Sequence, residues 1–322
     1  MASPASCVLL GDIGGTNARF ALVTDGRIGP IERSAVADYP DFDRALAVFL
    51  DRHRNEPPIS SAVLAVAGPI KANRSALINS GWIIDAGRLG QTFNLQNVRV
   101  VNDFKAVAWS LPHLEPHDLF AVGGGERAVA APAVVLGPGT GLGLACLVPR
   151  PYDSFVVITE AGHATLPGAN AREDAVIAHL RNHFGHVSVE RALSGPGLVN
   201  LYQSLAAIDH LSAPPRKPSE ITDAALRGSC PTSREALDMF CAMLGTVAGN
   251  AALTFDARGG IYIGGGIVPR LSEYLARSQF RARFEAKGRF QSYVAAIPSW
   301  VIMHPDPAFL GLQRLARQKI DQ

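Results

Sequence analysis

The chain has 322 residues, more than a single hydrophobic core usually supports, so we expect two domains with a cleft between them. Its formal net charge is only +2, and the 30 Lys and Arg residues are scattered singly, which argues against a nucleic-acid partner. The four cysteines show neither metal-ligand spacing nor a disulfide framework, and we find no targeting segment or uncharged apolar span of membrane length, which predicts a cytoplasmic location without a membrane partner.

The first half of the chain predicts strands and helices in alternation. Apolar runs at 7–10 and 18–23 predict two strands on either side of a glycine-rich turn, and an amphipathic helix is expected at about 41–54. Further strands are expected at 61–68, 76–79 and 98–101. The last of them delivers Asn102 and Asp103 at its carboxyl end, just before a helix, where α/β folds collect their ligands.

The order of elements in the first half recurs in the second. Residues 111–132 are rich in Pro, Gly and His, and we place the domain boundary there. In 131–148 an apolar strand, a Gly and Thr turn and a second apolar strand follow one another as before. Thr140 is therefore expected to be the equivalent of Thr16.

The rest of the chain is mostly helical. Helices are expected at about 172–184, 196–208 and 233–255. The stretch GGIYIGGGIVPRLSEYL predicts a strand, a triple-glycine turn and a helix. In the closing helix, Asp306 is expected as the N-cap and Pro307 as the first residue. The expected domains are a smaller α/β domain of residues 1–110, joined by the C-terminal helix in 301–322, and a larger α/β domain of residues 111–300.

Three glycine-rich turns are the most specific local signal. Glycine tolerates positive φ and has no side chain, so such turns expose backbone N–H groups to anions. A hairpin turn explains any one of them alone, but it explains poorly two matching turns at the heads of two half-chains. No lysine completes a Walker A pattern, and Leu142 stands where a dinucleotide fingerprint needs glycine. We therefore expect mononucleotide binding by Gly11, Asp12, Gly14, Gly15, Thr16 and Asn17, by Gly139, Thr140 and Gly141, and by Gly265 and Gly266.

Seven segments, spread over nearly the whole chain, are specific enough for comparison with known families. They are GDIGGTNARFAL, LINSGW, VVNDFKAVAW, LGPGTGLGLA, EAGHATLP, ERALSGPGLVNLY and GGIYIGGGIVPRL. Together they resemble the bacterial ATP-dependent glucokinases of the actin, heat-shock ATPase and hexokinase superfamily. The resemblance implies a two-domain actin-like ATPase (ribonuclease H-like) fold, with ATP and the sugar in the interdomain cleft, and a homodimer. Pro138 and Ala161 depart from the family's pattern and bear on loop geometry.

Two carboxylates are expected to carry chemistry. Phosphoryl transfer depends mostly on positioning and charge neutralisation, and a carboxylate opposes phosphate, so Asp12 is expected to orient Mg²⁺ through water. A turn-stabilising Asx side chain is the alternative. Asp103 is expected to accept the proton of the sugar hydroxyl. The alternative is a helix N-cap, and both roles can hold. Asn102 beside it can donate to and accept from a sugar hydroxyl.

By resemblance, three further residues bind the sugar: Glu160, His163 and Glu190. The expected activity is transfer of the γ-phosphoryl group of ATP to the 6-hydroxyl of D-glucose, which gives glucose 6-phosphate and ADP at the first step of glycolysis. The alternatives are a kinase for another hexose and a sugar-sensing protein without turnover. Asp103 argues against the sensor, because binding alone demands no base.

A histidine cluster invites a different interpretation. His179, His183 and His186 crowd the end of one expected helix, and a pair four residues apart can in principle hold zinc. No glutamate follows His179 to complete a metalloprotease signature. We expect these residues to lie on the solvated face of a capped helix.

Overall fold

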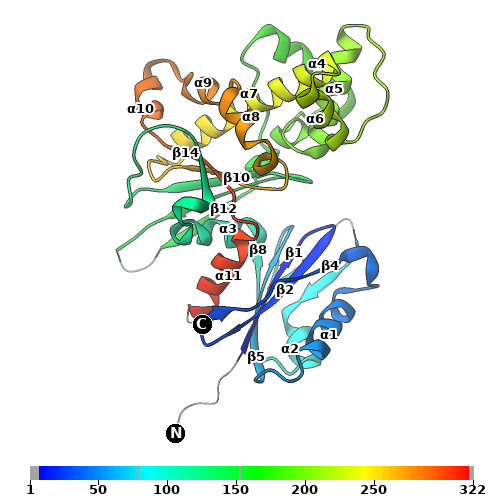
Figure 1. Ribbon diagram of the computed structural model, residues 1–322, viewed down its shortest axis with the longest axis vertical. Coiled ribbons are helices and arrows are strands. Elements are labelled where there is room, and N and C mark those ends of the chain that lie inside the picture. Colours follow the sequence, from blue (N-terminus) through cyan, green and yellow to red (C-terminus); the bar gives the residue numbers. More distant parts are fainter. Residues whose placement is uncertain (1–6, 78–79, 152–153, 319–322) are drawn as a thin grey trace. The chain divides into compact units, whose positions relative to one another are not determined.

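The computed structural model describes residues 7–77, 80–151 and 154–318, and the chain divides into two units (Figure 1). Unit 1 extends through Leu114 and resumes at His304, and unit 2 is Glu115–Met303. The sequence analysis places the two divisions near residues 110 and 300. The closing helix of the chain therefore belongs to the unit that holds the N-terminal strands.

Unit 1 is built on a six-stranded sheet. The strands of the unit are β1 (Cys7–Ile13), β2 (Asn17–Thr24), β3 (Arg27–Ile28), β4 (Glu32–Ala35), β5 (Ile59–Val66), β6 (Arg74–Ala76), β7 (Ile83–Asp85) and β8 (Asn97–Asn102). Its helices are α1 (Phe42–Arg52), α2 (Ala86–Thr92), α3 (Asp103–Ser110) and α11 (Pro307–Arg317). The sheet order is β3-β2-β1-β5-β8, with β4 paired to β2, while β6 pairs only with β7. Because β1, β5 and β8 are parallel, their carboxyl ends lie at one edge.

Different helices cover the two faces of this sheet (Figure 1). Leu9, Ile13 and Phe20 are buried with Phe42 and Phe49 of α1 in one core. Since successive side chains of a strand point to opposite faces, the residues between them face the other way. On that side α11 packs against α3, β1 and β5. Asp12 of β1 therefore lies on the face that α11 covers.

Unit 2 contains a second six-stranded sheet and most of the helices. Its strands are β9 (Leu119–Gly123), β10 (Ala133–Pro138), β11 (Leu142–Val148), β12 (Phe155–Thr159), β13 (Ile261–Ile263) and β14 (Ser299–Ile302). Its helices are α4 (Ala171–Phe184), α5 (Gly195–Ile208), α6 (Pro218–Arg227), α7 (Pro231–Thr254), α8 (Ser272–Arg277), α9 (Phe280–Glu285) and α10 (Gln291–Ala295). The sheet order is β12-β11-β10-β13-β14-β9.

The longest helix, α7, lies in the core of unit 2. Among the described residues it is the single helix long and apolar enough to cross a membrane by length and composition, and 83% of its most apolar window is buried inside the protein. It packs against α5, α6 and α9, and its residues Met239, Cys241 and Met243 are buried. The apolar character of α7 is therefore explained by the core of this unit.

The two sheets share one arrangement of strands. In unit 1, β1 is antiparallel to β2 and parallel to β5, which is parallel to β8. In unit 2, β10 is antiparallel to β11 and parallel to β13, which is parallel to β14. The recurrence that the sequence indicates is therefore present in the sheets themselves.

Most of the expected elements are confirmed to within a few residues. The strand expected at 76–79 is wrong in its bounds: β6 begins at Arg74 and ends at Ala76, and residues 78–79 lie outside the described part of the chain. The helices α2, α6, α9 and α10 were not predicted. The last two span only six and five residues, which is too short for a helical period to be recognised.

Candidate active site

The first glycine turn joins β1 to β2. Ile13 and Ala18 form the last pair of this antiparallel hairpin, and the Gly14 N–H donates to the Asn17 carbonyl at 2.9 Å. A Cβ on Gly11, within β1, would press against the Leu64 side chain of β5, so this glycine is a packing requirement of the sheet. Gly14, Gly15, Thr16 and Asn17 thus make up the turn itself, and Thr16 and Asn17 are exposed.

Strand register brings the other candidate residues of unit 1 to the same edge. Ile13 of β1 pairs with Val66 of β5, and Val66 pairs with Asn102 of β8. Neighbouring strands are about 4.8 Å apart, so Asn102 lies roughly 10 Å from Ile13 across the sheet. The first turn and the Asn102–Asp103 pair are therefore near neighbours at the carboxyl edge of the parallel strands.

The N-cap of α3 is one of the two roles that the sequence left open for Asp103. Asn102 is the N-cap of α3, since its Oδ1 accepts the Lys105 N–H at 3.1 Å. Asp103 is the first helical residue, and its Oδ1 accepts the Phe104 N–H at 2.9 Å. The alternative in which Asp103 is the N-cap is therefore wrong, because Asn102 has that place.

Asp12 is held by an arginine from the neighbouring strand. Asp12 and Arg19 are direct partners in the β1–β2 register, and Arg19 Nη1 donates to Asp12 Oδ2 at 2.7 Å. Burial raises the pKa of the Asp12 carboxyl above its ordinary 3.8, while the charge and the hydrogen bond of Arg19 oppose the shift. The alternative of an Asx turn has no counterpart among the hydrogen bonds of the described residues.

The hydrogen bonds of Asp12 leave one of its carboxylate oxygens able to hold a magnesium ion through water. Arg19 occupies Oδ2, and the described residues provide no hydrogen bond to Oδ1. A carboxylate with one oxygen left to accept can receive a hydrogen bond from water on Mg²⁺, which keeps several waters in such sites. The residues present therefore fit a magnesium ion held through water.

The second glycine turn is the meeting point of several segments of unit 2. It joins β10 to β11 between the paired residues Pro138 and Leu142, and the Gly139 carbonyl accepts the Gly195 N–H at 2.8 Å at the start of α5. Gly265 of the third turn has a φ of +83°, and a Cβ there would collide with the Pro138 carbonyl. The second and third turns and the N-terminus of a 14-residue helix are thus adjacent, and a helix N-terminus favours anions.

The equivalence of Thr16 and Thr140 depends on the strand from which it is counted. Residues 14–17 separate the last pair of the first hairpin, whereas residues 139–141 separate the last pair of the second. Thr16 and Thr140 correspond when counted back from Ala18 and Leu142, the first paired residues after each turn, because each threonine lies two residues before them. The first turn is one residue longer, so the two turns are similar without being superimposable residue by residue.

The three residues expected to bind the sugar lie on two adjoining segments of unit 2. Glu160 directly precedes a short 3₁₀ turn, Ala161–His163, of which His163 is the last residue, and both side chains are exposed. Glu190 lies in a second 3₁₀ turn, Val189–Arg191, and the two turns are linked because the Val189 N–H donates to the Ala164 carbonyl. The structure therefore brings these three residues into one region.

The backbone of Leu142 connects this region to the second glycine turn. The Leu142 N–H donates to Glu190 Oε2 at 2.8 Å, and a Cβ on Gly162 would collide with the Leu142 carbonyl. Ala161 is half-buried against the core, and its N–H donates to the Thr159 hydroxyl. The close approach thus needs glycine at position 162, and alanine at 161 is accommodated.

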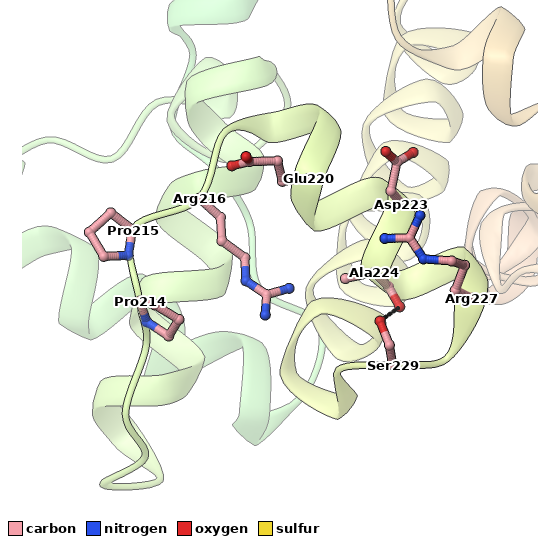
Figure 2. A pocket seen from close by; sticks show the side chains of 8 residues that line it. All are labelled: Pro214, Pro215, Arg216, Glu220, Asp223, Ala224, Arg227 and Ser229. Atoms are coloured by element: carbon pink, nitrogen blue, oxygen red, sulfur yellow. Dashed lines mark hydrogen bonds between the residues drawn. The ribbon is translucent and has the colours of Figure 1, made fainter.

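Two other features of unit 2 contain none of the expected site residues. A pocket of about 360 Å³ lies beside α6 (Figure 2), where Arg216, Glu220, Asp223 and Arg227 are among its lining residues. The histidines of α4 have ordinary partners: His179 contacts the Ser204 hydroxyl, and His183 contacts the His179 carbonyl. His183 is exposed and His179 is half-buried, while His186 lies beyond the end of α4 and is exposed. No metal-binding cluster is found among the described residues.

The sequence analysis missed two parts of the site. It did not use the start of α5, where Ser194 caps the helix and Gly195 contacts the second turn, although the sequence SGPG carries both a capping residue and the glycine. It also missed Arg19, whose partner Asp12 is apparent only once β1 and β2 are paired.

Two matched hairpins that end in glycine turns, with a helix N-terminus against the second, define a phosphate-binding α/β protein. The glucokinase family model matches residues 9–319, and the chain belongs to the glucokinase family. It is 48% identical over 311 residues to the glucokinase of Paramagnetospirillum magneticum, across 96% of this chain and 97% of that one. It is 44% identical to the glucokinase of Nitrobacter hamburgensis, across 95% and 96% of the two chains. The resemblance carried by the seven sequence segments is confirmed.

Solved structures agree with this membership. The chain is similar to a glucokinase from an Antarctic psychrotroph, with a TM-score of 0.86 and 34% identity across 97% of this chain and 99% of that one. The fold is also shared with the glucokinase of Balamuthia mandrillaris, solved in complex with glucose, at a TM-score of 0.79 and 20% identity across 98% and 94% of the two chains. The mixed α/β fold is therefore that of the glucokinases, and the chain is a kinase.

Proposed function

We propose that the chain transfers the γ-phosphoryl group of ATP to the 6-hydroxyl of D-glucose, giving glucose 6-phosphate and ADP. The observation that carries this proposal is the pair of matched hairpins, because a single glycine turn is common, whereas the same hairpin and glycine turn at the head of each unit is poorly explained as a simple turn. The same duplication supports an actin-like, two-domain ATPase fold of the ribonuclease H-like type. Family membership supports glucose as the acceptor.

In the proposed reaction, the Asp103 carboxylate accepts the proton of the sugar 6-hydroxyl. The sugar 6-oxygen forms a bond to the γ-phosphorus as the bond from the γ-phosphorus to the oxygen that bridges it to the β-phosphorus breaks. The bridging oxygen leaves as part of ADP. Asp103 is suited to this step because Asn102 already caps α3, so the Asp103 side chain is not required for the cap. A positioned base of this kind contributes roughly 10²- to 10⁴-fold in rate.

The remaining residues bind and orient. We assign the second glycine turn (Gly139, Thr140 and Gly141) to the phosphates, through the N–H groups of Thr140 and Gly141, because the Gly139 N–H donates to the Gly141 carbonyl. The Gly195 N–H at the start of α5 donates to the Gly139 carbonyl, so this helix contributes its dipole. Asn102, Glu160, His163 and Glu190 are assigned to sugar hydroxyls. Magnesium supplies neutralisation of the phosphate charge, and Asp12 orients it through water.

A coupled assay for ADP formation, with glucose, mannose, fructose and N-acetylglucosamine as acceptors, tests the proposal. Turnover should require ATP and Mg²⁺ and should be fastest with glucose, because an acceptor that leaves buried polar groups unpaired is rejected strongly. A preference for fructose, or for polyphosphate over ATP, would contradict the assignment. Binding of glucose without any turnover would instead favour a sugar-sensing protein.

We also propose a cytoplasmic homodimer, which rests on family membership. Multi-angle light scattering of the purified chain measures the mass in solution. A mass of twice 34.1 kDa at micromolar concentration is the expected result, and a monomer at that concentration would contradict it.

A further inference from the structure

Four charged side chains of alternating sign form a linked network on one face of the unit 1 sheet. Arg19 donates to Asp12 at 2.7 Å, and its Nε lies 3.5 Å from Asp306 Oδ1. Arg33 donates to Asp306 Oδ2 at 2.5 Å. The Asp306 side chain is 6% exposed and that of Asp12 is 18% exposed, so solvent screens the inner part of this network only weakly.

Strand register explains why Asp306 is needed in the network. Asp12 of β1, Arg19 of β2 and Arg33 of β4 are successive partners across the sheet. Arg19 and Arg33 are therefore like charges on directly opposite residues, an arrangement that destabilises a sheet. Asp306 contacts both guanidinium groups, so the carboxylate compensates the repulsion between them.

Asp306 reaches this position from the far end of the sequence. It is the N-cap residue of α11, as expected, but its side chain makes no cap hydrogen bond. That carboxylate is instead committed to the two arginines. The start of α11 is thereby tied to the residue that holds Asp12.

One contact in the network is incomplete. Arg19 Nε and Asp306 Oδ1 are both buried and have no hydrogen-bond partner, and their separation of 3.5 Å is longer than an ordinary N–H···O bond. The contact of Arg19 with Asp12 is short. Arg19 is thus bound most tightly to the candidate magnesium residue, and Asp306 restrains it from the other side.

We propose that Arg19 and Asp306 are positioning residues for the magnesium-bound nucleotide, and that they act through Asp12. Arg19 occupies Oδ2 of Asp12, which leaves Oδ1 to accept from magnesium-bound water, and Asp306 fixes the guanidinium that does so. The terminal helix α11 is thereby part of the support of the nucleotide site. This inference rests on the proposed function.

The test measures how strongly magnesium favours ADP binding. Isothermal titration gives the dissociation constant of ADP with Mg²⁺ and with EDTA, and the ratio of the two reports the use of magnesium without any turnover. Removal of an outer-shell partner typically costs 10- to 100-fold in metal affinity. Arg19→Met should therefore reduce this ratio about tenfold or more and leave ADP binding in EDTA unchanged. Asp306→Asn should reduce it by less.

Two comparisons separate positioning from a general loss of structure. Arg88→Met breaks an arginine–aspartate contact of 2.9 Å with Asp43, elsewhere in unit 1, and should leave the ratio unchanged. Arg19→Lys keeps the charge but has a single nitrogen to contact both Asp12 and Asp306. Its ratio of ADP dissociation constants in EDTA and in Mg²⁺ should therefore lie between those of Arg19→Met and the wild type. If Arg19→Met does not fold, Arg19→Lys and Asp306→Asn carry the test.

A double-mutant cycle decides whether Arg19 acts through Asp12. In an Asp12→Asn background, Arg19→Met should cause no further loss in the magnesium ratio, whereas additive losses would overturn the inference. An unchanged ratio in all Arg19 and Asp306 variants would overturn it as well. A wild-type chain that binds neither ADP nor glucose would instead contradict the proposed function, so the two failures are distinguishable.

Discussion

Glu190 and Leu142 are joined by a hydrogen bond of 2.8 Å from the Leu142 N–H to the Glu190 carboxylate, which therefore lies against the glycine turn 139–141. A Cβ on Gly141 would collide with the same carboxylate oxygen. A residue assigned to the sugar thus also supports a turn assigned to the phosphates. We therefore predict that Glu190 couples the binding of the two proposed substrates.

The first prediction separates Glu190 from His163. Glu190→Ala should raise KM for glucose and also KM for ATP, because the turn loses its support. His163→Ala should raise KM for glucose alone, since the exposed His163 side chain makes no hydrogen bond to the turn among the described residues. A hydrogen bond to a charged group is worth about 1.5–3 kcal/mol, so the Glu190 effect on glucose should be roughly 10- to 100-fold. Steady-state kinetics with each substrate varied in turn measure both constants, and an unchanged KM for ATP in Glu190→Ala would disprove the coupling.

The second prediction concerns the proposed base. Asp103→Asn should lower kcat by roughly 10²- to 10⁴-fold while glucose affinity is largely kept, because an amide can hydrogen-bond the sugar but cannot accept a proton. The N-cap of α3 belongs to Asn102, so the helix should remain intact. Glu160→Gln should instead act mainly on KM for glucose. Near wild-type kcat in Asp103→Asn would assign the base to another residue.

The third prediction uses two adjacent glycines as a matched pair. Gly265 has a φ of +83° and no room for a Cβ beside the Pro138 carbonyl, whereas a Cβ on Gly266 meets nothing within 4 Å. Gly265→Ala should therefore destabilise the protein by about 1–3 kcal/mol and raise KM for ATP. Gly266→Ala should leave the unfolding free energy nearly unchanged. Urea unfolding of both variants is the measurement, and equal effects would contradict the assigned close approach.

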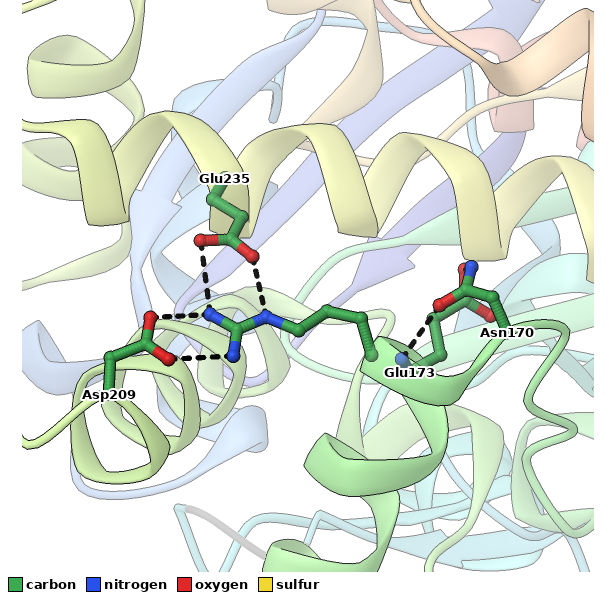
Figure 3. Close-up of polar contacts among 5 residues, drawn as sticks. Asn170, Glu173, Asp209 and Glu235 are labelled. Atoms are coloured by element: carbon green, nitrogen blue, oxygen red, sulfur yellow. Dashed lines mark hydrogen bonds and ion pairs between the residues drawn. The ribbon is translucent and has the colours of Figure 1, made fainter.

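The fourth prediction compares two neighbouring residues of α4 (Figure 3). Glu173 is buried, accepts from the Ala169 and Asn170 nitrogens, and pairs with Arg283 at 2.6 Å. Glu173→Gln should cost about 3–5 kcal/mol of stability, because the guanidinium of Arg283, whose side chain is only 17% exposed, is left uncompensated.

Arg172 provides the control for this prediction. It contacts Asp209 and Glu235, but its side chain is 34% exposed. Arg172→Gln should therefore cost no more than about 1 kcal/mol. Both variants should keep the wild-type KM values. A loss in Arg172→Gln as large as that in Glu173→Gln would show that burial does not decide the difference.

The fifth prediction is a loss of stability at alkaline pH. Burial raises the pKa of the Cys241 thiol from 9.0 to about 12. Above pH 9 the unfolded chain ionises this thiol while the folded chain does not, so stability is complete below pH 9 and falls as the pH rises toward 12. The loss should be roughly 1.4 kcal/mol between pH 8 and pH 10. Urea unfolding at both pH values gives the free energy of unfolding, and Cys241→Ser should lack this part of its fall with pH. Equal falls in the wild type and in Cys241→Ser would contradict the assignment of the loss to Cys241.

The sequence by itself determined the elements whose signals are local. The apolar runs around the first turn and the period of α1 both act within a few residues, and the structure has them where they were expected. The glycine turns were also recognisable from sequence, because their backbone requirements belong to the turns themselves. Family membership followed from the same local motifs.

The tertiary structure alone decided which distant residues share a site. Nothing in the sequence near Asp306 indicates that its carboxylate serves Arg19 and Arg33 in place of the helix cap, because that choice depends on α11 packing against β1. The same holds for Glu190 and Leu142, which are 48 residues apart and meet only when the segment of Glu190 docks beside β11. Local sequence specifies backbone conformation, whereas the partner of a buried charge is selected by whatever the rest of the fold brings within a few ångströms of it.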